Sequence, residues 1–268
     1  MKTISLLKPC KHLSFYFYLF LLVLWSFQGF SQKSISKKDI EITTQLTFIR
    51  VQAADKNKFE QALSRLSLLA RENKIKEDYD WLGYESDSKA YLFINFSTGL
   101  NDVLKLSDYR EEFYRLGKKV EFDSILDSLK DCNFEVTGHF LQEMLLPWSS
   151  VKEISVSKHP FTTMVEYKIY ADQLDEFDTY TRQLVKLLKE TGYEYPLEGN
   201  RGSFGAYSSV FHIWFYDKEM RINIQDHLET WMKKKGKKDE WKNLFRKFDS
   251  LSFSRKNYQL KYLPKISY

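Results

Sequence analysis

The chain has 268 residues, which is enough for one or two domains with a buried core. Aromatic residues make up 16% of it and charged residues 29%, a balance that excludes an intrinsically disordered chain. The formal net charge is +5, and part of it lies in the first 31 residues.

The N-terminal segment has the pattern of a secretory signal peptide. Three lysines and no acidic residue precede the apolar run Phe15–Trp25, and Gly29 and Ser31 then supply the small residues expected before a cleavage site. The run is shorter than the ~20 residues that span a bilayer, which favours cleavage over an uncleaved anchor. We therefore expect residues 1–31 to be removed, leaving no transmembrane segment, and the protein to be exported to the periplasm or secreted.

Cleavage changes the charge and the cysteine content of the mature chain. It removes three of the 41 basic residues and none of the 36 acidic ones, so the mature net charge is +2. That charge supplies no overall field for nucleic acid. Cys10 leaves with the signal peptide and Cys132 remains as the single cysteine. No internal disulfide is therefore expected, and the core must stabilise the fold.

The mature chain aligns with itself. Residues 117–122 (Gly-Lys-Lys-Val-Glu-Phe) match residues 236–241 (Gly-Lys-Lys-Asp-Glu-Trp) at an offset of 119. Upstream, an offset of 118 places Ile49 on Tyr167 and Phe59 on Phe177. One structural unit used twice explains both offsets, with small loop insertions between the matching blocks.

Each copy shows the same order of predicted elements, with alternating β-rich residues in the strands and apolar spacings of three and four in the helices. The first copy contains strands at 46–51, 79–84, 89–96 and from 134, and helices at 55–70, 109–116 and 122–129. The second contains strands at 164–169, 193–197, 207–216 and from 253, and helices at 172–188, 225–235 and 241–248. The glycine-rich segment 199–205 is expected to be a turn.

The order β-α-β-β-α-β is that of a ferredoxin-like unit, in which helices cover one face of a four-stranded antiparallel sheet. We predict an α+β protein with two such units in tandem, residues 43–146 and 162–268, joined by a linker at 147–161 and preceded by a linker at 32–42. The strand at 207–216 is bulky on both faces, so the second sheet face also needs a cover. The economical arrangement packs the units sheet to sheet as an intramolecular α/β barrel.

This element order, the duplication and the strand character resemble the dimeric α+β-barrel superfamily over residues 43–262. That superfamily includes proteins of the antibiotic-biosynthesis-monooxygenase-like, stress-responsive-barrel and NIPSNAP-like kinds. The resemblance implies the barrel fold. It also implies a range of activities, from cofactor-free oxygenases and haem-handling enzymes to proteins with no known reaction, and selects none of them.

The barrel interior is the natural place for a ligand, because it lies between two sheets. Strand alternation sends Phe48, Arg50, Glu166 and Lys168 into it. Ionisable groups in an aromatic interior are costly unless they are paired or bind a polar ligand. We expect Arg50 and Lys168 either to anchor a small amphipathic or acidic molecule, or to pair with Glu166 or reach solvent at the rim.

A second candidate group lies on the strand 207–216. His212, Trp214 and Tyr216 share one face of this strand, and if that face points into the barrel, His212 could act as an acid–base group. The alternative is a core histidine that is only hydrogen-bonded. No residue is assigned a catalytic role, because the sequence contains no nucleophile motif.

Cofactor and nucleic-acid sites find little support. No histidines occur at chelating spacing, so no metal site and no cofactor are predicted, while haem stays open because one axial ligand suffices, with His227 or His212 in that role. Residues 89–96 approach the third-strand signature of RNA-recognition motifs but depart from it at Ala90 and Leu92, and we expect no nucleic-acid partner.

Three hypotheses for function follow. The first is an exported small-molecule-binding protein with its ligand between the sheets. The second is a cofactor-free oxygenase or a haem-handling enzyme of the dimeric α+β-barrel type. The third is a structural or interaction protein whose barrel is filled by its own side chains. The contents of the barrel distinguish the third hypothesis from the other two.

Overall fold

The computed structural model describes residues 40–75, 81–86, 88, 90–97, 109–150, 154–202, 207–217 and 224–268. The predicted signal peptide, residues 1–31, and the segment 32–39 lie outside the described residues. Within the described part, no helix is both long and apolar enough to span a membrane.

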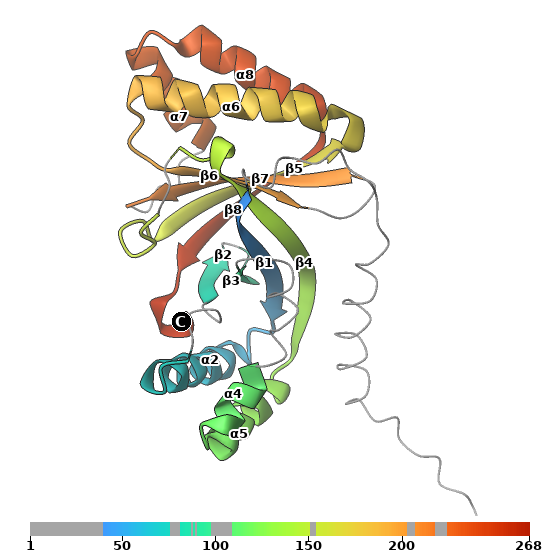
Figure 1. The fold of residues 1–268 in the computed structure, drawn as a ribbon, viewed down its shortest axis with the longest axis vertical. Helices are drawn as coiled ribbons and strands as arrows, with labels where there is room; N and C mark the ends of the chain where they lie inside the picture. The colour runs from blue at the N-terminus through green and yellow to red at the C-terminus, as the bar shows by residue number, and fades with distance from the viewer. Residues whose placement is uncertain are drawn as a thin grey trace, which may run out of the picture. The chain divides into compact units, whose positions relative to one another are not determined.

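The chain shows the β-α-β-β-α-β order twice, each time with one additional helix, α4 or α7 (Figure 1). The first copy comprises β1 (Ile40–Val51), α2 (Lys56–Glu72), β2 (Trp81–Ser86), β3 (Ala90–Ser97), α4 (Tyr109–Arg115), α5 (Lys119–Lys130) and β4 (Phe134–Leu145). The second comprises β5 (Phe161–Tyr170), α6 (Leu174–Thr191), β6 (Leu197–Gly202), β7 (Tyr207–Tyr216), α7 (Ile224–Lys234), α8 (Lys238–Leu251) and β8 (Ser252–Tyr262). The short 3-10 turns η4 (Leu146–Trp148), η5 (Ala171–Gln173) and η6 (Pro264–Ile266) follow β4, β5 and β8.

The strands form one closed antiparallel barrel in the order β1-β3-β2-β8-β5-β7-β6-β4. Each half contributes four neighbouring strands, β4-β1-β3-β2 and β8-β5-β7-β6, which is the ferredoxin-like strand order. The halves join at two junctions, where β4 pairs with β6 and β2 pairs with β8. The predicted α+β fold, with two ferredoxin-like units closed into a barrel, is therefore confirmed.

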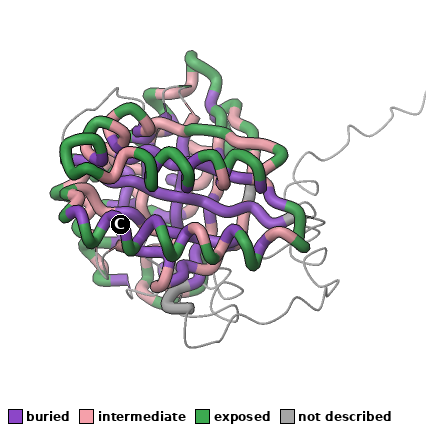
Figure 2. Tube along the Cα trace, turned by 90° about the horizontal axis from the view of Figure 1, so that it is seen from above, coloured by how far each residue is buried: buried purple, intermediate pink, exposed green. Residues whose placement is uncertain are grey.

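Helices cover the outer face of each half-sheet, and the inner faces of the two sheets meet inside the barrel (Figure 1). In the first half, Phe59, Ala62 and Leu69 of α2 pack with Tyr91 and Phe93 of β3. Their spacing places these helix residues on one face of α2. Figure 2 shows that the strands are largely buried and that the outward turns of the helices are exposed. The barrel thus has an inner side-chain layer that is distinct from the outer helix–sheet cores.

The repeated Gly-Lys-Lys block connects two helices in each copy. Gly117 lies between α4 and α5 with φ +73°, and Gly236 lies between α7 and α8 with φ +70°. Both values fall in the left-handed region, which glycine enters without steric cost. The strongest match between the two copies therefore reflects a structural turn.

The segments that follow β4 and β8 each dock on the opposite half of the barrel. A Cβ atom on Gly199 of β6 would lie 2.8 Å from the carbonyl oxygen of Trp148, which is buried. A Cβ atom on Gly83 of β2 would lie 2.7 Å from Cγ1 of Ile266. Glycine is needed at both positions because another chain segment lies where a side chain would be.

This docking corrects one expectation from the sequence. Residues 199–202 belong to strand β6, so the prediction of a turn at 199–205 is wrong for this part. The glycine at 199 serves close approach by Trp148, which lies in the segment predicted as a linker. The backbone N–H of Gly83 and that of Gly199 donate to the hydroxyls of Ser267 (2.9 Å) and Ser149 (3.4 Å), so the two contacts are equivalent.

Candidate functional site

An aromatic layer crosses the barrel interior. The ring of Phe48 on β1 lies 5.1 Å from that of Tyr258 on β8, and the ring of Phe140 on β4 lies 5.7 Å from that of Phe211 on β7. Neither pair belongs to neighbouring strands, so these contacts run across the interior. At this level, aromatic side chains from non-neighbouring strands contact one another across the interior.

A cluster of four polar side chains lies beside this layer, at the β4–β6 junction. We call it the amide cluster, and it consists of Thr44, Gln142, Asn200 and Glu198. Thr44 lies directly opposite Gln142 across β1 and β4, and Gln142 is diagonal to Asn200 across β4 and β6. All four share the strand faces of the inner apolar residues, Leu46 on β1, Phe140 on β4, and Phe211 and Ile213 opposite β6.

Several polar atoms of the amide cluster have no hydrogen-bond partner among the described residues. Gln142 has no exposed surface, yet neither its Oε1 nor its Nε2 is bonded. Thr44 Oγ1 and Asn200 Oδ1 are also buried and unbonded. Leaving one buried donor or acceptor unsatisfied costs about 1–3 kcal/mol. Such a concentration in one place indicates bound water or a ligand.

The other junction shows that the fold does not require Gln142 or Asn200, although it keeps a buried threonine, Thr162, whose hydroxyl is also unbonded among the described residues. By the strand registers, Thr44 opposite Gln142 corresponds to Thr162 opposite Leu260. Asn200, opposite Met144, likewise corresponds to Tyr84, opposite Tyr262. A leucine thus fills the position equivalent to Gln142 in the same backbone geometry. Packing alone does not explain the glutamine.

The carboxylate of Glu198 is part of the amide cluster. Its Oε1 accepts a hydrogen bond of 2.7 Å from Asn200 Nδ2. Burial raises the pKa of the Tyr84 hydroxyl strongly, and the nearby charges of Glu198 and Tyr262 raise it further. The charge of Glu198 therefore influences a group inside the barrel, and the Tyr84 hydroxyl stays neutral there.

A second buried carboxylate, Glu166, lies in the interior on β5. Its side chain is almost fully enclosed, and it accepts hydrogen bonds from the Tyr258 hydroxyl (2.9 Å) and from Ser209 Oγ (3.5 Å). Burial raises the pKa of Tyr258, and the charge of Glu166 raises it further. Unlike the amide cluster, this carboxylate has its partners within the chain.

The structure places the four residues expected in the interior in different surroundings. Phe48 and Glu166 line the interior, and Lys168 is half-buried on the same strand face as Glu166. The side chain of Arg50 is 67% exposed and pairs with Glu135 at 3.0 Å. Arg50 is near the end of β1, where its long side chain reaches solvent. Of the two alternatives for Arg50, the structure fits the one in which the side chain reaches solvent, and Arg50 does not anchor a ligand inside the barrel.

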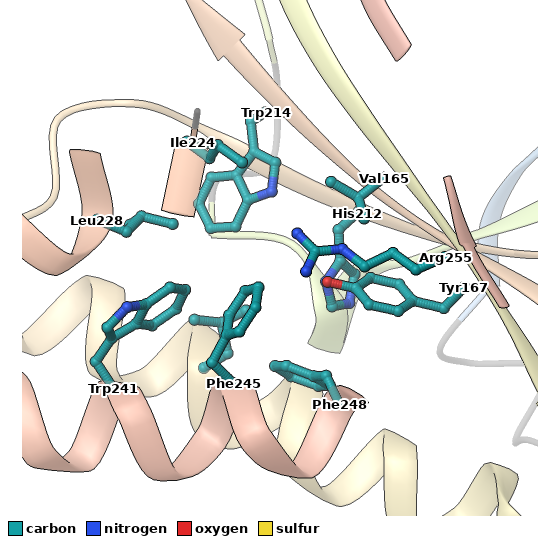
Figure 3. Close-up of a pocket in the computed structure, with 11 residues that line it drawn as sticks. Val165, Tyr167, His212, Trp214, Ile224, Leu228, Trp241, Phe245, Phe248 and Arg255 are labelled. Atoms are coloured by element: carbon teal, nitrogen blue, oxygen red, sulfur yellow. The ribbon is translucent and has the colours of Figure 1, made fainter. Parts of the chain in front are cut away.

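His212 and Trp214 face the helices of the second half, away from the barrel interior (Figure 3). Tyr216 shares their strand face, and its ring lies 5.0 Å from that of Tyr195. The His212 ring lies between 5.2 and 5.7 Å from the rings of Tyr167, Phe177 and Phe248. Its Nε2 is 3.3 Å from Thr181 Oγ1. Burial lowers the pKa of His212 to about 3, and the charge of Arg255 contributes to this. It is a neutral core histidine, the second of the two alternatives for this residue, and a role in acid–base chemistry inside the barrel is excluded for it.

The cavity beside His212 is too small for a ligand. Its volume is about 10 Å³, room for about one water molecule. Figure 3 shows Trp214 and Trp241 on opposite sides of it and the guanidinium of Arg255 at its edge. The Arg255 guanidinium lies 4.6 Å from the centre of the Phe245 ring. This region is part of the helix–sheet core.

Comparison with solved structures identifies the fold. A candidate monooxygenase of Fusobacterium nucleatum superposes with a TM-score of 0.53 at 9% identity, covering 84% of this chain and 93% of that one. A candidate monooxygenase of Lactobacillus acidophilus gives 0.51 at 9% identity, covering 83% and 94%. The chain has the dimeric α+β-barrel fold. No protein-family model and no curated protein matches the sequence, and identities this low show the fold alone.

Haem is one cofactor that the dimeric α+β-barrel resemblance implies, and the two histidines proposed as axial ligands do not fit it. His212 is enclosed by three aromatic rings outside the barrel. His227 lies on α7, where its Nδ1 is 2.8 Å from the Tyr193 hydroxyl and its ring contacts Tyr193 and Tyr195. Among the described residues, no three side chains form a group that could hold a metal ion.

The amide cluster was missed by the sequence analysis. The offset of 119, found at the matching block nearest to Gln142, places this residue on Lys261. Only the strand registers show that Gln142 corresponds to the core residue Leu260. Asn200 was hidden because its glycine neighbours indicated a turn.

Proposed function

We propose that the protein binds a small molecule inside the barrel, with the amide cluster as its polar contact. The observation that supports this most is Gln142, which is fully buried with both ends of its amide unbonded among the described residues. A ligand that satisfies these atoms would recover the hydrogen-bonding free energy that the chain itself leaves unused. The ring layer of Phe140 and Phe211 next to the cluster suits a partly apolar ligand.

We further propose that the binding protein is exported. The support is the basic, apolar and small-residue pattern of residues 1–31, and the single cysteine of the mature chain is compatible with an oxidising compartment. N-terminal sequencing of the protein from its own host should begin at Gln32. A chain that retains Met1–Ser31 in the cytoplasm would contradict export.

Cofactor-free oxygenation is a second candidate function. Two proteins with this fold are described as candidate monooxygenases, which favours it. Such a reaction needs a base, and the buried carboxylate of Glu166 could serve as one. In this case the ligand of the barrel would be a substrate. Glu166 would act from β5, which is separated from Asn200 on β6 by Phe211 of β7.

Native mass spectrometry of the protein purified from its own host tests both functions. We expect one small molecule per chain, released on unfolding, and we expect Gln142→Leu to lose it while the matched variant Leu260→Met retains it. A ligand that gains oxygen when anaerobically purified protein is exposed to air would favour the oxygenase, and Glu166→Gln should then stop the gain. A wild-type chain that carries no ligand would contradict the proposal.

A further inference from the structure

The amide cluster presents donors and acceptors in a proportion that limits what it can bind. Gln142 offers one donor end and one acceptor end, whichever way its amide is turned. The orientation of Asn200 is fixed, because a carboxylate has no proton to donate and Glu198 must therefore accept from Nδ2. Asn200 Oδ1 is thus a free acceptor, and the Thr44 hydroxyl can act in either role.

An anionic group does not suit this arrangement. A carboxylate or phosphate ligand only accepts hydrogen bonds, so it would leave Asn200 Oδ1 and the oxygen of Gln142 without donors. It would also lie near the charge of Glu198. Arg201, the next residue after Asn200, points to the other face of β6, where it pairs with Glu143 at 2.8 Å.

A cationic group matches the cluster only in part. An ammonium ion could donate to both amide oxygens, and Glu198 would attract it. It carries no acceptor, however, and would leave the nitrogen of Gln142 unsatisfied in a fully buried position. Only a group with a donor and an acceptor side by side can satisfy Gln142 completely.

We infer that the amide cluster binds a neutral amide-type group, a carboxamide or a lactam, whose N–H and carbonyl oxygen pair with the side chain of Gln142. This inference rests on the proposed function and specifies the ligand class of the same site. The group would be attached to an apolar or aromatic body, because Phe140 is the next interior residue on β4 and Phe211 is opposite Asn200. Of the expected small amphipathic or acidic molecule anchored by Arg50 and Lys168, it keeps the amphipathic character and moves the polar contact to Gln142.

Three probes that share a phenyl ring test the ligand class. Binding of benzamide, benzoate and benzylamine to the purified protein is measured by calorimetry. We expect benzamide to bind at least about tenfold more tightly than either charged probe, the difference for one unsatisfied buried group. Gln142→Leu should lose the benzamide affinity by a similar factor. Leu260→Met, at the equivalent position of the other junction, should leave it unchanged.

The outcomes separate the inference from the proposed function. Benzoate or benzylamine binding as tightly as benzamide, with loss of affinity in Gln142→Leu, would overturn the ligand class and leave the site in place. Benzamide binding equally to wild type and Gln142→Leu would overturn the assignment to the amide cluster. If none of the probes binds, the inference fails, and native mass spectrometry decides whether the proposed function fails with it. Circular dichroism of Gln142→Leu checks that this variant folds.

Discussion

The two junctions of the barrel share one backbone arrangement and differ in chemistry. At the β2–β8 junction, Leu260 packs in one cluster with Tyr84 and Tyr262, whose tilted rings lie 5.7 Å apart. At the β4–β6 junction, Gln142 and Asn200 occupy the equivalent positions with unbonded polar atoms. The duplication thus supplies an internal reference. Where one copy has an apolar residue at a core position, a buried and unbonded polar residue at the equivalent position of the other copy indicates function rather than packing.

The largest effect on stability is expected where the segments after β4 and β8 contact Gly199 of β6 and Gly83 of β2. Gly199→Ala should lower the free energy of unfolding by about 3 kcal/mol, because the new methyl group meets the backbone and Cβ of Trp148. Gly83→Ala should cost less, about 2 kcal/mol, because its closest contacts are Cγ1 and Cδ1 of the Ile266 side chain, with the carbonyl oxygen of Ile266 3.1 Å away. Urea unfolding of both variants measures the difference. Equal losses would show that the two contacts are equally adaptable.

A smaller loss of stability is expected at acidic pH, because β7 has a histidine where β3 has a phenylalanine. His212 occupies the position equivalent to Phe93 by strand register. Its pKa is about 3 in the folded protein and near 6.5 when unfolded, so the unfolded chain binds more protons between these values. The stability it contributes is complete above pH 6.5 and decreases as the pH falls toward 3.

This proton uptake should be visible in a matched variant. Between pH 7 and pH 5, protonation of the unfolded histidine should lower the free energy of unfolding by about 2 kcal/mol. In His212→Phe, which copies the first half, this part of the loss should be absent. Urea unfolding of both proteins at the two pH values provides the measurement. Identical pH dependence would mean that His212 accepts a proton without unfolding.

The smallest effect concerns the central comparison itself. In protein freed of its ligand, Gln142→Leu should raise the free energy of unfolding by about 1 kcal/mol, because it removes buried polar atoms that nothing satisfies. Leu260→Gln should lower it, since it introduces the same problem at the other junction. Opposite signs support the difference between the junctions. A loss of stability in Gln142→Leu would instead indicate that the glutamine is bonded by ordered water.

The sequence predicted the fold better than the site, for physical reasons. Element order and duplication are local patterns, and they were enough to predict the closed barrel. Which face of β7 points into the barrel was not predictable, because Phe211–Tyr216 has bulky residues on both faces and their alternation does not distinguish the inner face from the outer one. Gln142 and Asn200 are neighbours only through the register of β4 on β6, a long-range pairing between the two halves.

The most direct test of the account is a high-resolution crystal structure of the protein purified from its own host. We predict non-protein density within hydrogen-bonding distance of both amide atoms of Gln142, from a molecule that continues toward Phe140 and Phe211. Density of isolated waters alone, or a Gln142 amide bonded only to neighbouring side chains, would contradict a ligand site inside the barrel.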